Sequence, residues 1–185
     1  MTTHAIDCDM GVDCMEPCPV AMHAAGQPHR KGSGRDEWRT PPYFFEHVQR
    51  TYGVTFTRDC AADADNSLCD LHCSEHESFF DTPDQWFKGQ VCWLNPPFSK
   101  MAVFTERVLH LAAHGATVFM LGPSAMDTKY SHRMLASPTH RPVFTRGRIS
   151  FIDPVTRIGK PGNPIGSVLW VPVSHWDGAF SIERG

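Results

Sequence analysis

The chain has 185 residues, of which 41% are hydrophobic and 20% charged, and its net charge at pH 7 is −3. This length suits one domain with a substantial core and leaves no room for a separate recognition domain. The first residues do not resemble a signal peptide and the apolar runs are too short to cross a bilayer. We therefore expect a cytoplasmic protein with no membrane partner.

Seven cysteines, an odd number, favour reduced thiols over a disulfide framework. Residues 1–34 lack apolar periodicity, so we expect a flexible leader there and one domain over 35–185. Two Cys/His groups are possible zinc sites. The first lacks close CxxC pairs, and two members of the second fall in apolar or turn contexts, so we expect no metal. The groups are Cys8, Cys14, Cys18 and His23, and Cys60, Cys69, Cys73 and His76.

The first regular element is a helix that we expect Thr40 to cap, with Pro41 as its first residue and Gly53 as its stop. Its apolar residues recur on one face, as in a helix that packs on a core. A short strand is expected at 54–57, running into Asp59. Residues 63–90 are irregular and acidic.

The second half alternates strands and helices. We expect strands at 91–94, 116–121, 143–144, 148–152 and 167–171, and helices at 101–112 and 128–135. The loop 153–166 would join the last two strands as a long hairpin. This order predicts an α/β fold with a doubly wound, mostly parallel sheet and an antiparallel hairpin at its carboxyl-terminal end.

The sequence Asn95-Pro96-Pro97-Phe98 follows the strand expected at 91–94. Open α/β sheets place their sites at the carboxyl ends of strands, and two prolines make this turn stiff. The side-chain oxygen of Asn95 and the carbonyl of Pro96 could both accept from an exocyclic amine, which leaves the nitrogen lone pair free for a methyl donor. Phe98 offers a face for a base. The turn therefore indicates amino methylation.

Five motifs together resemble those of the phage-type DNA N6-adenine methyltransferases, in the same order and over roughly residues 36–172. They are Asp36-Glu37-Trp38-Arg39-Thr40-Pro41, Asp59-Cys60-Ala61-Ala62 with Asn66, Leu94 to Ser99, Gly147 to Phe151, and Asn163-Pro164. The resemblance implies a Rossmann-like fold that transfers a methyl group from S-adenosylmethionine to N6 of adenine in double-stranded DNA. The adenine would be flipped out of the duplex, held by Asn95 and stacked on Phe98.

The same resemblance places the methyl donor. Thr40 and Pro41 would line its methionine end, Asp59 would pair with its ammonium, Ala61 would allow close approach, and Asn66 would complete the pocket. The ribose partner stays open among Glu75, Glu77 and Asp81. The chain departs from many methyltransferases because it lacks their Gly-x-Gly loop.

Basic residues concentrate between Lys129 and Lys160, where seven Lys or Arg residues face one Asp. This segment carries +6 and the remainder of the chain −9. We expect one basic face that contacts DNA, because phosphate contacts supply most non-specific affinity. The residues expected to touch phosphates or base edges are Lys129, Arg146, Arg148 and Arg157.

Other substrates fit the same turn, since relatives with this motif methylate cytosine N4, RNA adenine or protein glutamine. A catalytically silent nucleic-acid-binding module is a further alternative, which the intact Asn95 to Phe98 sequence disfavours. The Thr-Pro element and the basic segment favour DNA. The sequence does not choose the target site, the oligomeric state, or a role in restriction-modification over one in gene expression.

Overall fold

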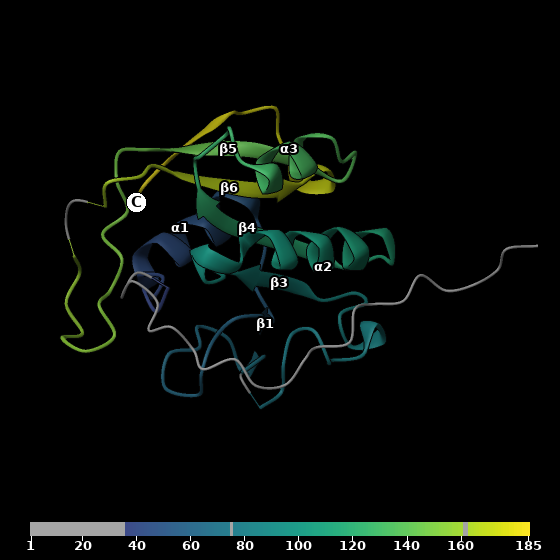
Figure 1. Ribbon diagram of the computed structural model, residues 1–185, viewed down its shortest axis with the longest axis horizontal. Coiled ribbons are helices and arrows are strands. Elements are labelled where there is room, and N and C mark those ends of the chain that lie inside the picture. Colours follow the sequence, from purple (N-terminus) through teal and green to yellow (C-terminus); the bar gives the residue numbers. More distant parts are fainter. Residues whose placement is uncertain (1–35, 75, 161–162) are drawn as a thin grey trace, which may run out of the picture. The chain divides into compact units, whose positions relative to one another are not determined.

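A computed structural model describes residues 36–74, 76–160 and 163–185. These residues form a seven-stranded sheet in the order β2-β1-β3-β4-β6-β5-β7 (Figure 1). The strands are β1 (Arg58–Asp59), β2 (Leu71–His72), β3 (Val91–Leu94), β4 (Thr117–Pro123), β5 (His140–Arg146), β6 (Ser167–Pro172) and β7 (Ser181–Glu183). The helices are α1 (Pro42–Tyr52), α2 (Met101–Ala113) and α3 (Lys129–Leu135), with short 3-10 turns η1 (Asp84–Trp86), η2 (Phe98–Lys100) and η3 (Val173–His175).

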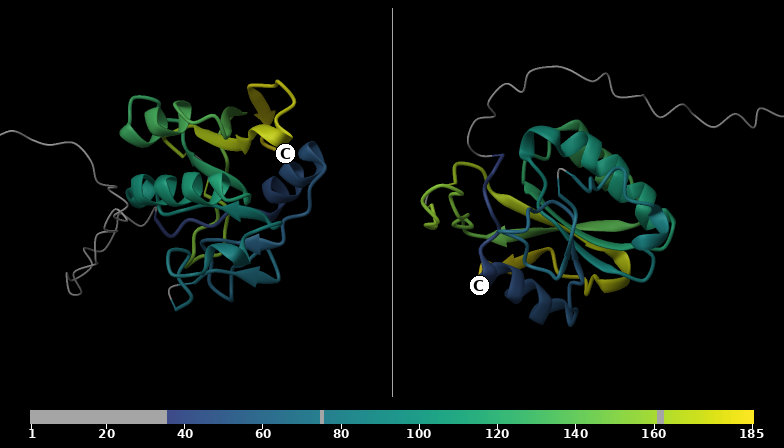
Figure 2. Two further views of the ribbon diagram at one scale, coloured as in Figure 1. Left: turned by 90° about the vertical axis from the view of Figure 1, so that its right-hand side faces the viewer. Right: turned by 90° about the horizontal axis from the view of Figure 1, so that it is seen from below.

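The sheet lies between two helical layers, with α1 on one face and α2 on the other (Figure 2). Side chains of successive strand residues point to opposite faces, so each strand contributes residues to the hydrophobic clusters on both faces of the sheet. In β3, Trp93 packs with Phe44 and Phe45 of α1, whereas Cys92 and Leu94 join the cluster of α2 and α3. Burial on both faces explains the nearly continuous apolar runs of β3, β4 and β6.

Strand directions confirm an α/β sheet that is mostly parallel and fits a Rossmann-like arrangement. β1 pairs in parallel with β2 and β3, β3 with β4, and β5 with β7. β6 is antiparallel to both β4 and β5. The predicted antiparallel hairpin therefore exists, but its first strand is β5, and residues 147–166 connect its two strands.

The segment 148–152 was expected to be a strand of that hairpin, and this expectation is wrong. Gly147 adopts a φ of 83°, which ends β5, and only Ile152 makes ladder contacts, with Arg39 and Gly159. Ile149 and Phe151 are fully buried in the α1-side core. These two residues alternate with polar ones because they are the buried side chains of a loop that packs beside residues 36–40. The alternation does not come from a strand paired with β6.

Two further boundaries differ from the sequence predictions. Residues 54–57 are not a strand: the first strand is the two-residue β1, and Phe56 instead fills the core between Trp93 and Phe119. Pro41, and not Thr40, is the N-cap of α1, and no side chain caps this helix. Gly53 does end it, with a left-handed φ of 62°.

None of the helices in the described ranges has the length and apolar character that a membrane crossing requires. Cys60, Cys69, Cys73 and Cys92 are free thiols. The other three cysteines, and with them the first Cys/His group and the leader predicted at 1–34, lie outside the described residues.

Candidate functional site

One edge of the sheet collects the predicted site residues. β1, β3 and β4 run in parallel, and β5 has the same direction because β6 is antiparallel to both β4 and β5. Their carboxyl ends therefore lie at the same edge. Asp59 ends β1, Asn95 follows β3, Ser124 follows β4 and Arg146 ends β5. The loop 147–166 also starts and finishes there, which brings it to the edge where α/β sheets bind ligands.

The amide of Asn95 is held in one orientation. Its Nδ2 donates to the backbone carbonyl of Trp38 at 3.1 Å, and because a carbonyl can only accept, this contact fixes which end of the amide is oxygen. The Oδ1 atom is buried and has no hydrogen-bond partner in the described part of the chain. An unpaired buried acceptor costs about 1–3 kcal/mol, and such atoms often mark functional sites.

Three alternate residues of the segment 36–40 accept hydrogen bonds from β3 and from the turn that follows it. Asp36 Oδ1 accepts from the backbone N–H of Ser99 at 3.1 Å, Trp38 accepts from Asn95, and Thr40 Oγ1 accepts from the indole N–H of Trp93 at 3.4 Å. On its other side, Arg39 exchanges two backbone hydrogen bonds of 3.0 Å with Ile152. The sequence interpretation had given only Thr40 and Pro41 a role here. Sequence reasoning missed Asp36 and Trp38 because their partners, Ser99 and Asn95, lie 63 and 57 residues away in the chain.

Phe98 opens η2 and is half-buried. Its ring meets that of Phe151 edge to face, with centroids 6.1 Å apart, and Phe151 in turn stacks on Trp38 at 6.1 Å. Since Phe151 is only 1% exposed, this aromatic group anchors Phe98 from the core side. Pro96 is buried and Pro97 is the N-cap of η2, so both prolines lie in the turn itself.

Asp59 is a buried carboxylate without a cationic side chain bonded to it in the described residues. It is 5% exposed, and its two oxygens accept from the backbone N–H groups of Ala61 at 3.3 Å and Leu68 at 3.4 Å. Burial raises the pKa of Asp59 to about 6, against the weaker opposing effects of those two hydrogen bonds and of His72. A bound cation would offset that desolvation.

The other predicted donor residues lie around the same strand ends. Thr40 and Pro41 are buried next to β3, and Ala61 is partly buried after β1. Asn66 closes a turn, because its Oδ1 accepts from Asp63 N–H at 2.6 Å while its own N–H donates to the Asp63 carbonyl. Glu77 and Asp81 are exposed between β2 and η1, and Glu75 lies outside the described residues.

The basic segment divides into two parts in the structure. Arg133 pairs with Glu106 of α2 at 3.0 Å, and Arg141 at the start of β5 bonds backbone carbonyls at the opposite edge of the sheet. Arg146 and Arg157 do lie on the side of Asn95, but Arg146 pairs with Glu183 at 3.3 Å and Arg157 with Asp65 at 3.0 Å. The expected single basic face is therefore not a property of the whole segment.

Arg148 and Lys129 differ from these residues because neither forms an ion pair within the described ranges. Both are exposed. The guanidinium of Arg148 lies beside Gly166 and Ser124: a Cβ atom added to Gly166 would stand 2.8 Å from Arg148 Nη1 and 2.6 Å from Ser124 Oγ. Arg148 thus reaches over the carboxyl end of β4, on the side of Asn95.

Comparison with known proteins places the chain in a family. Residues 27–182 match the sequence model of the family described as DNA N-6-adenine-methyltransferase (Dam). The chain is 26% identical over 151 residues to the DNA N-6-adenine-methyltransferase of Escherichia phage T1, covering 74% of this chain and 62% of that protein. It is 28% identical over 125 residues to the protein of the same name in Haemophilus phage HP1 (strain HP1c1), covering 66% and 70% respectively.

The chain therefore spans less than two thirds of the phage T1 protein. The family match nevertheless includes every residue described above at the carboxyl edge of the sheet. On this evidence the chain belongs to the DNA N-6-adenine-methyltransferase (Dam) family.

Proposed function

We propose that this protein transfers a methyl group from S-adenosylmethionine to N6 of adenine in double-stranded DNA. The observation that carries the proposal is the unpartnered Oδ1 of Asn95, held by the Trp38 carbonyl at the end of β3 in a chain of this family. The Rossmann-like sheet would then serve as a methyltransferase fold, with residues 35–185 as the catalytic domain.

The chemistry needs a better nucleophile than free adenine offers, because the N6 lone pair is delocalised into the ring. Asn95 Oδ1 and the Pro96 carbonyl each accept one amine proton, which directs the lone pair out of the base plane. Both acceptors are fixed before substrate arrives, one by Trp38 and the other by two prolines, so little reorganisation accompanies the reaction.

S-adenosylmethionine would supply a methyl group on a positively charged sulfur, and its carbon–sulfur bond would break, with the electron pair staying on sulfur, as the nitrogen–carbon bond forms. The nitrogen is then positively charged and releases one proton to water. Asn95 Oδ1 and the Pro96 carbonyl, which already accept the amine protons, stabilise the positive charge on that nitrogen.

Thr40, Pro41, Asp59, Ala61 and Asn66 are the residues proposed to hold the donor. Asp59 fits an ammonium because it is a buried carboxylate whose present partners are two backbone N–H groups at 3.3 and 3.4 Å. An ammonium beside it would favour its ionised form and form a charge-assisted hydrogen bond.

The N6 amine is inaccessible in a duplex, so the base must leave the stack. Phe98 is half-buried and anchored on Phe151, which suits a platform for a flipped adenine. Arg148 and Lys129, with Arg146 and Arg157 at the same edge, are proposed to contact the phosphates that flank it.

The experiment is incubation of the full chain with isotope-labelled S-adenosylmethionine and unmethylated DNA, followed by mass spectrometry of the digested nucleosides. Labelled N6-methyladenine is expected from the wild type and at least about a hundredfold less from Asn95→Ala. Label in N4-methylcytosine in place of N6-methyladenine would assign a different base as the substrate. Donor binding without any transfer would identify a silent module.

A further inference from the structure

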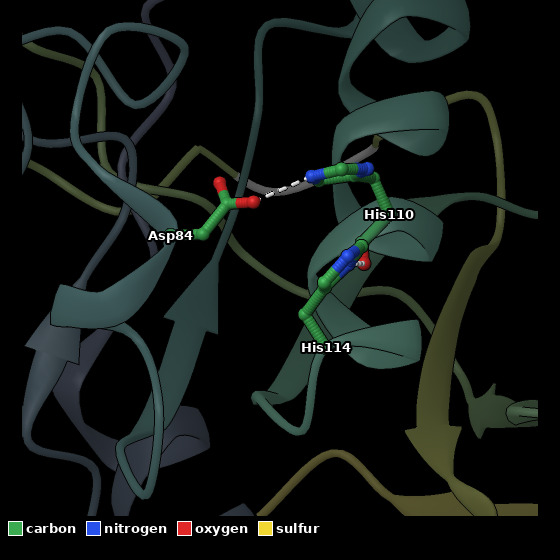
Figure 3. A group of neighbouring side chains, drawn as sticks. All are labelled: Asp84, His110 and His114. Atoms are coloured by element: carbon green, nitrogen blue, oxygen red, sulfur yellow. Dashed lines mark hydrogen bonds and ion pairs between the residues drawn. The ribbon is translucent and has the colours of Figure 1, made fainter. Parts of the chain in front are cut away.

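A second group of chemically active side chains lies at the opposite edge of the sheet. Asp84 belongs to η1, which precedes the start of β3, and His110 and His114 lie in the last turn and at the C-cap of α2, which precedes the start of β4 (Figure 3). One possible ligand atom from each residue lies within 4.8 Å of the other two. Residues 36–74, 76–160 and 163–185 contain no other such group of three or more His, Cys, Asp or Glu side chains.

The three side chains face one another because of helical spacing. Residues four apart in a helix project from the same face, so His110 and His114 are neighbours, with ring centroids 4.3 Å apart. The Nε2 atom of His110 lies 2.6 Å from Asp84 Oδ2. Figure 3 shows the carboxylate of Asp84 directed from η1 toward the His110 ring.

Neighbouring groups hold these side chains in place. Arg107 donates to Asp84 Oδ1 at 2.6 Å, and it also binds the carbonyls of Phe79 at 3.2 Å and Thr82 at 2.7 Å. This leaves Asp84 Oδ2 for the histidine side. His114 Nδ1 lies 2.8 Å from the backbone oxygen of His110, which orients that ring and leaves it a second nitrogen. Ligands whose far sides are hydrogen-bonded in this way are typical of metal sites.

Two imidazoles and one carboxylate form a nitrogen-rich set that suits zinc and disfavours magnesium or calcium, which prefer oxygen ligands.

We propose that Asp84, His110 and His114 bind one zinc ion, with water as the fourth ligand. Tetrahedral zinc with bonds of about 2.0–2.1 Å separates its ligand atoms by about 3.3–3.5 Å, so the 2.6 Å contact between Asp84 Oδ2 and His110 Nε2 widens when the ion binds. The side chains have room to move, since Asp84 is 37% and His110 48% exposed. Solvent also gives the ion a path of entry.

The ion joins the irregular segment before β3 to the end of α2. It does not take part in the proposed methyl transfer, because Asn95 lies at the other end of β3. Its effect is structural: an ion that binds only the folded chain stabilises the contact between η1 and α2. The two proposals are therefore independent of each other.

The experiment titrates zinc into the chelator-treated full chain by calorimetry. The cysteines and histidines of residues 1–35 can also bind zinc, so the test compares variants of the same chain. His110→Gln and His114→Gln are each expected to lower the affinity for one of the bound zinc ions by at least about tenfold. The matched control is His132→Gln, an exposed histidine on α3, which is expected to bind as the wild type does.

Cobalt provides a second measurement on the same variants. Cobalt at the Asp84 site is expected to give visible bands without a sulfur-to-metal charge-transfer band, and those bands are expected to disappear in His114→Gln. Circular dichroism without metal checks that each variant is folded. The proposal is overturned if His110→Gln and His114→Gln bind zinc as tightly as wild type, or if all bound cobalt shows sulfur ligation.

Discussion

At the scale of single residues, Asn95 combines a structural and a chemical role in one amide. Its Nδ2 is bonded to Trp38 while its Oδ1 has no partner in the described residues. A buried acceptor without a partner contributes no hydrogen bond to the fold, so this oxygen is available to a ligand. Loss of the side chain should therefore affect the proposed reaction much more than the stability.

We expect Asn95→Ala to lower the methyl transfer rate by about a hundredfold or more while the free energy of unfolding changes by only about 1 kcal/mol. The matched variant Asn95→Asp keeps an acceptor oxygen but loses the donor to Trp38, so it should retain more activity than Asn95→Ala. Single-turnover rates and urea denaturation provide the two readings. Equal rates for wild type and Asn95→Ala would remove Asn95 from the reaction.

Asp59 makes donor binding depend on pH. Its pKa is about 6 in the free protein, and only the ionised carboxylate can pair with an ammonium. The affinity for S-adenosylmethionine is therefore expected to be constant above pH 6 and to fall as the pH drops below it, by about tenfold per unit when the pair requires the charge. Calorimetry between pH 5 and 8 measures this dependence.

The isosteric variant Asp59→Asn is the control for that measurement. It cannot ionise, so its donor affinity should be weaker at pH 7 and lack the dependence below pH 6. If the variant showed the same pH dependence as the wild type, another group would be responsible and Asp59 would not face the donor.

At the scale of elements, long periodic segments were predictable and short or context-dependent ones were not. β3, α2 and α3 follow from apolar runs and helical spacing. β1 and β7 have two and three residues, too few for a period to show. The segment 148–152 alternates like a strand, but Ile149 and Phe151 are buried by α1-side packing and their backbone is a loop.

The candidate site shows the same division. Asn95 to Phe98 was predictable because strand, turn and chemistry are contiguous in sequence. The roles of Asp36 and Trp38 depend on contacts across about sixty residues, and the sequence contains no sign of that separation. The assignment of Asn95, Pro96, Pro97 and Phe98 to catalysis stays a prediction. So do the assignments to donor and DNA for Thr40, Pro41, Asp59, Ala61, Asn66 and the four basic residues.

Gly166 tests whether the loop 147–166 positions Arg148. A Cβ atom there would meet Arg148 Nη1 at 2.8 Å and Ser124 Oγ at 2.6 Å, so Gly166→Ala must displace these side chains. Its backbone does not require glycine, because φ is not in the left-handed region. We expect Gly166→Ala to weaken DNA binding with little loss of stability. In a chain that already carries Arg148→Ala, the same substitution should cause little further loss of DNA affinity. Additive losses in the double variant would show that the two residues act separately.

At the scale of the whole molecule, two buried titratable groups give opposite pH dependences of stability. Burial lowers the pKa of His140 to about 4, because its charged form is disfavoured between β4 and β5, where Nε2 lies 2.9 Å from the Val118 carbonyl. As the pH falls from 6.5 to 4 the unfolded chain binds a proton that the folded chain does not, so stability falls. Asp59 has a raised pKa, so the folded chain binds this proton at a higher pH than the unfolded chain does. Its contribution to stability therefore rises as the pH falls from 6 to 4.

The pKa values of about 6 for Asp59 and about 4 for His140 lie roughly two units from the ordinary values of these groups. One unit corresponds to about 1.4 kcal/mol, so each group contributes on the order of 3 kcal/mol. Relative to wild type, His140→Gln should become more stable by this amount as the pH falls from 7 to 4, and Asp59→Asn less stable. Urea denaturation at several pH values measures both differences. Parallel curves for wild type and both variants would contradict the two pKa shifts.

The distribution of charge gives a test of where DNA lies. A net charge of −3 opposes nucleic-acid binding unless cations without acidic partners gather on one side. The ion pairs of Arg133, Arg146 and Arg157 with Glu106, Glu183 and Asp65 neutralise much of the basic segment. Arg148 reaches over the carboxyl end of β4, on the side of Asn95, and Lys129 is the first residue of α3. Neither forms an ion pair within the described residues, so they should supply the phosphate contacts.

We therefore expect Arg148→Ala and Lys129→Ala each to weaken binding to all duplexes by a similar factor and to lower the slope of log affinity against log salt by about one. Arg133→Ala is the matched control, since this arginine is exposed but paired with Glu106 on α2, and it should leave the slope unchanged. If Arg148 reads a guanine edge instead, its removal would reduce discrimination at one base pair while the slope stays constant. Binding isotherms on a specific and a scrambled duplex at several salt concentrations separate these outcomes. An unchanged affinity and slope in the Arg148→Ala, Lys129→Ala double variant would place the duplex on another face of the sheet.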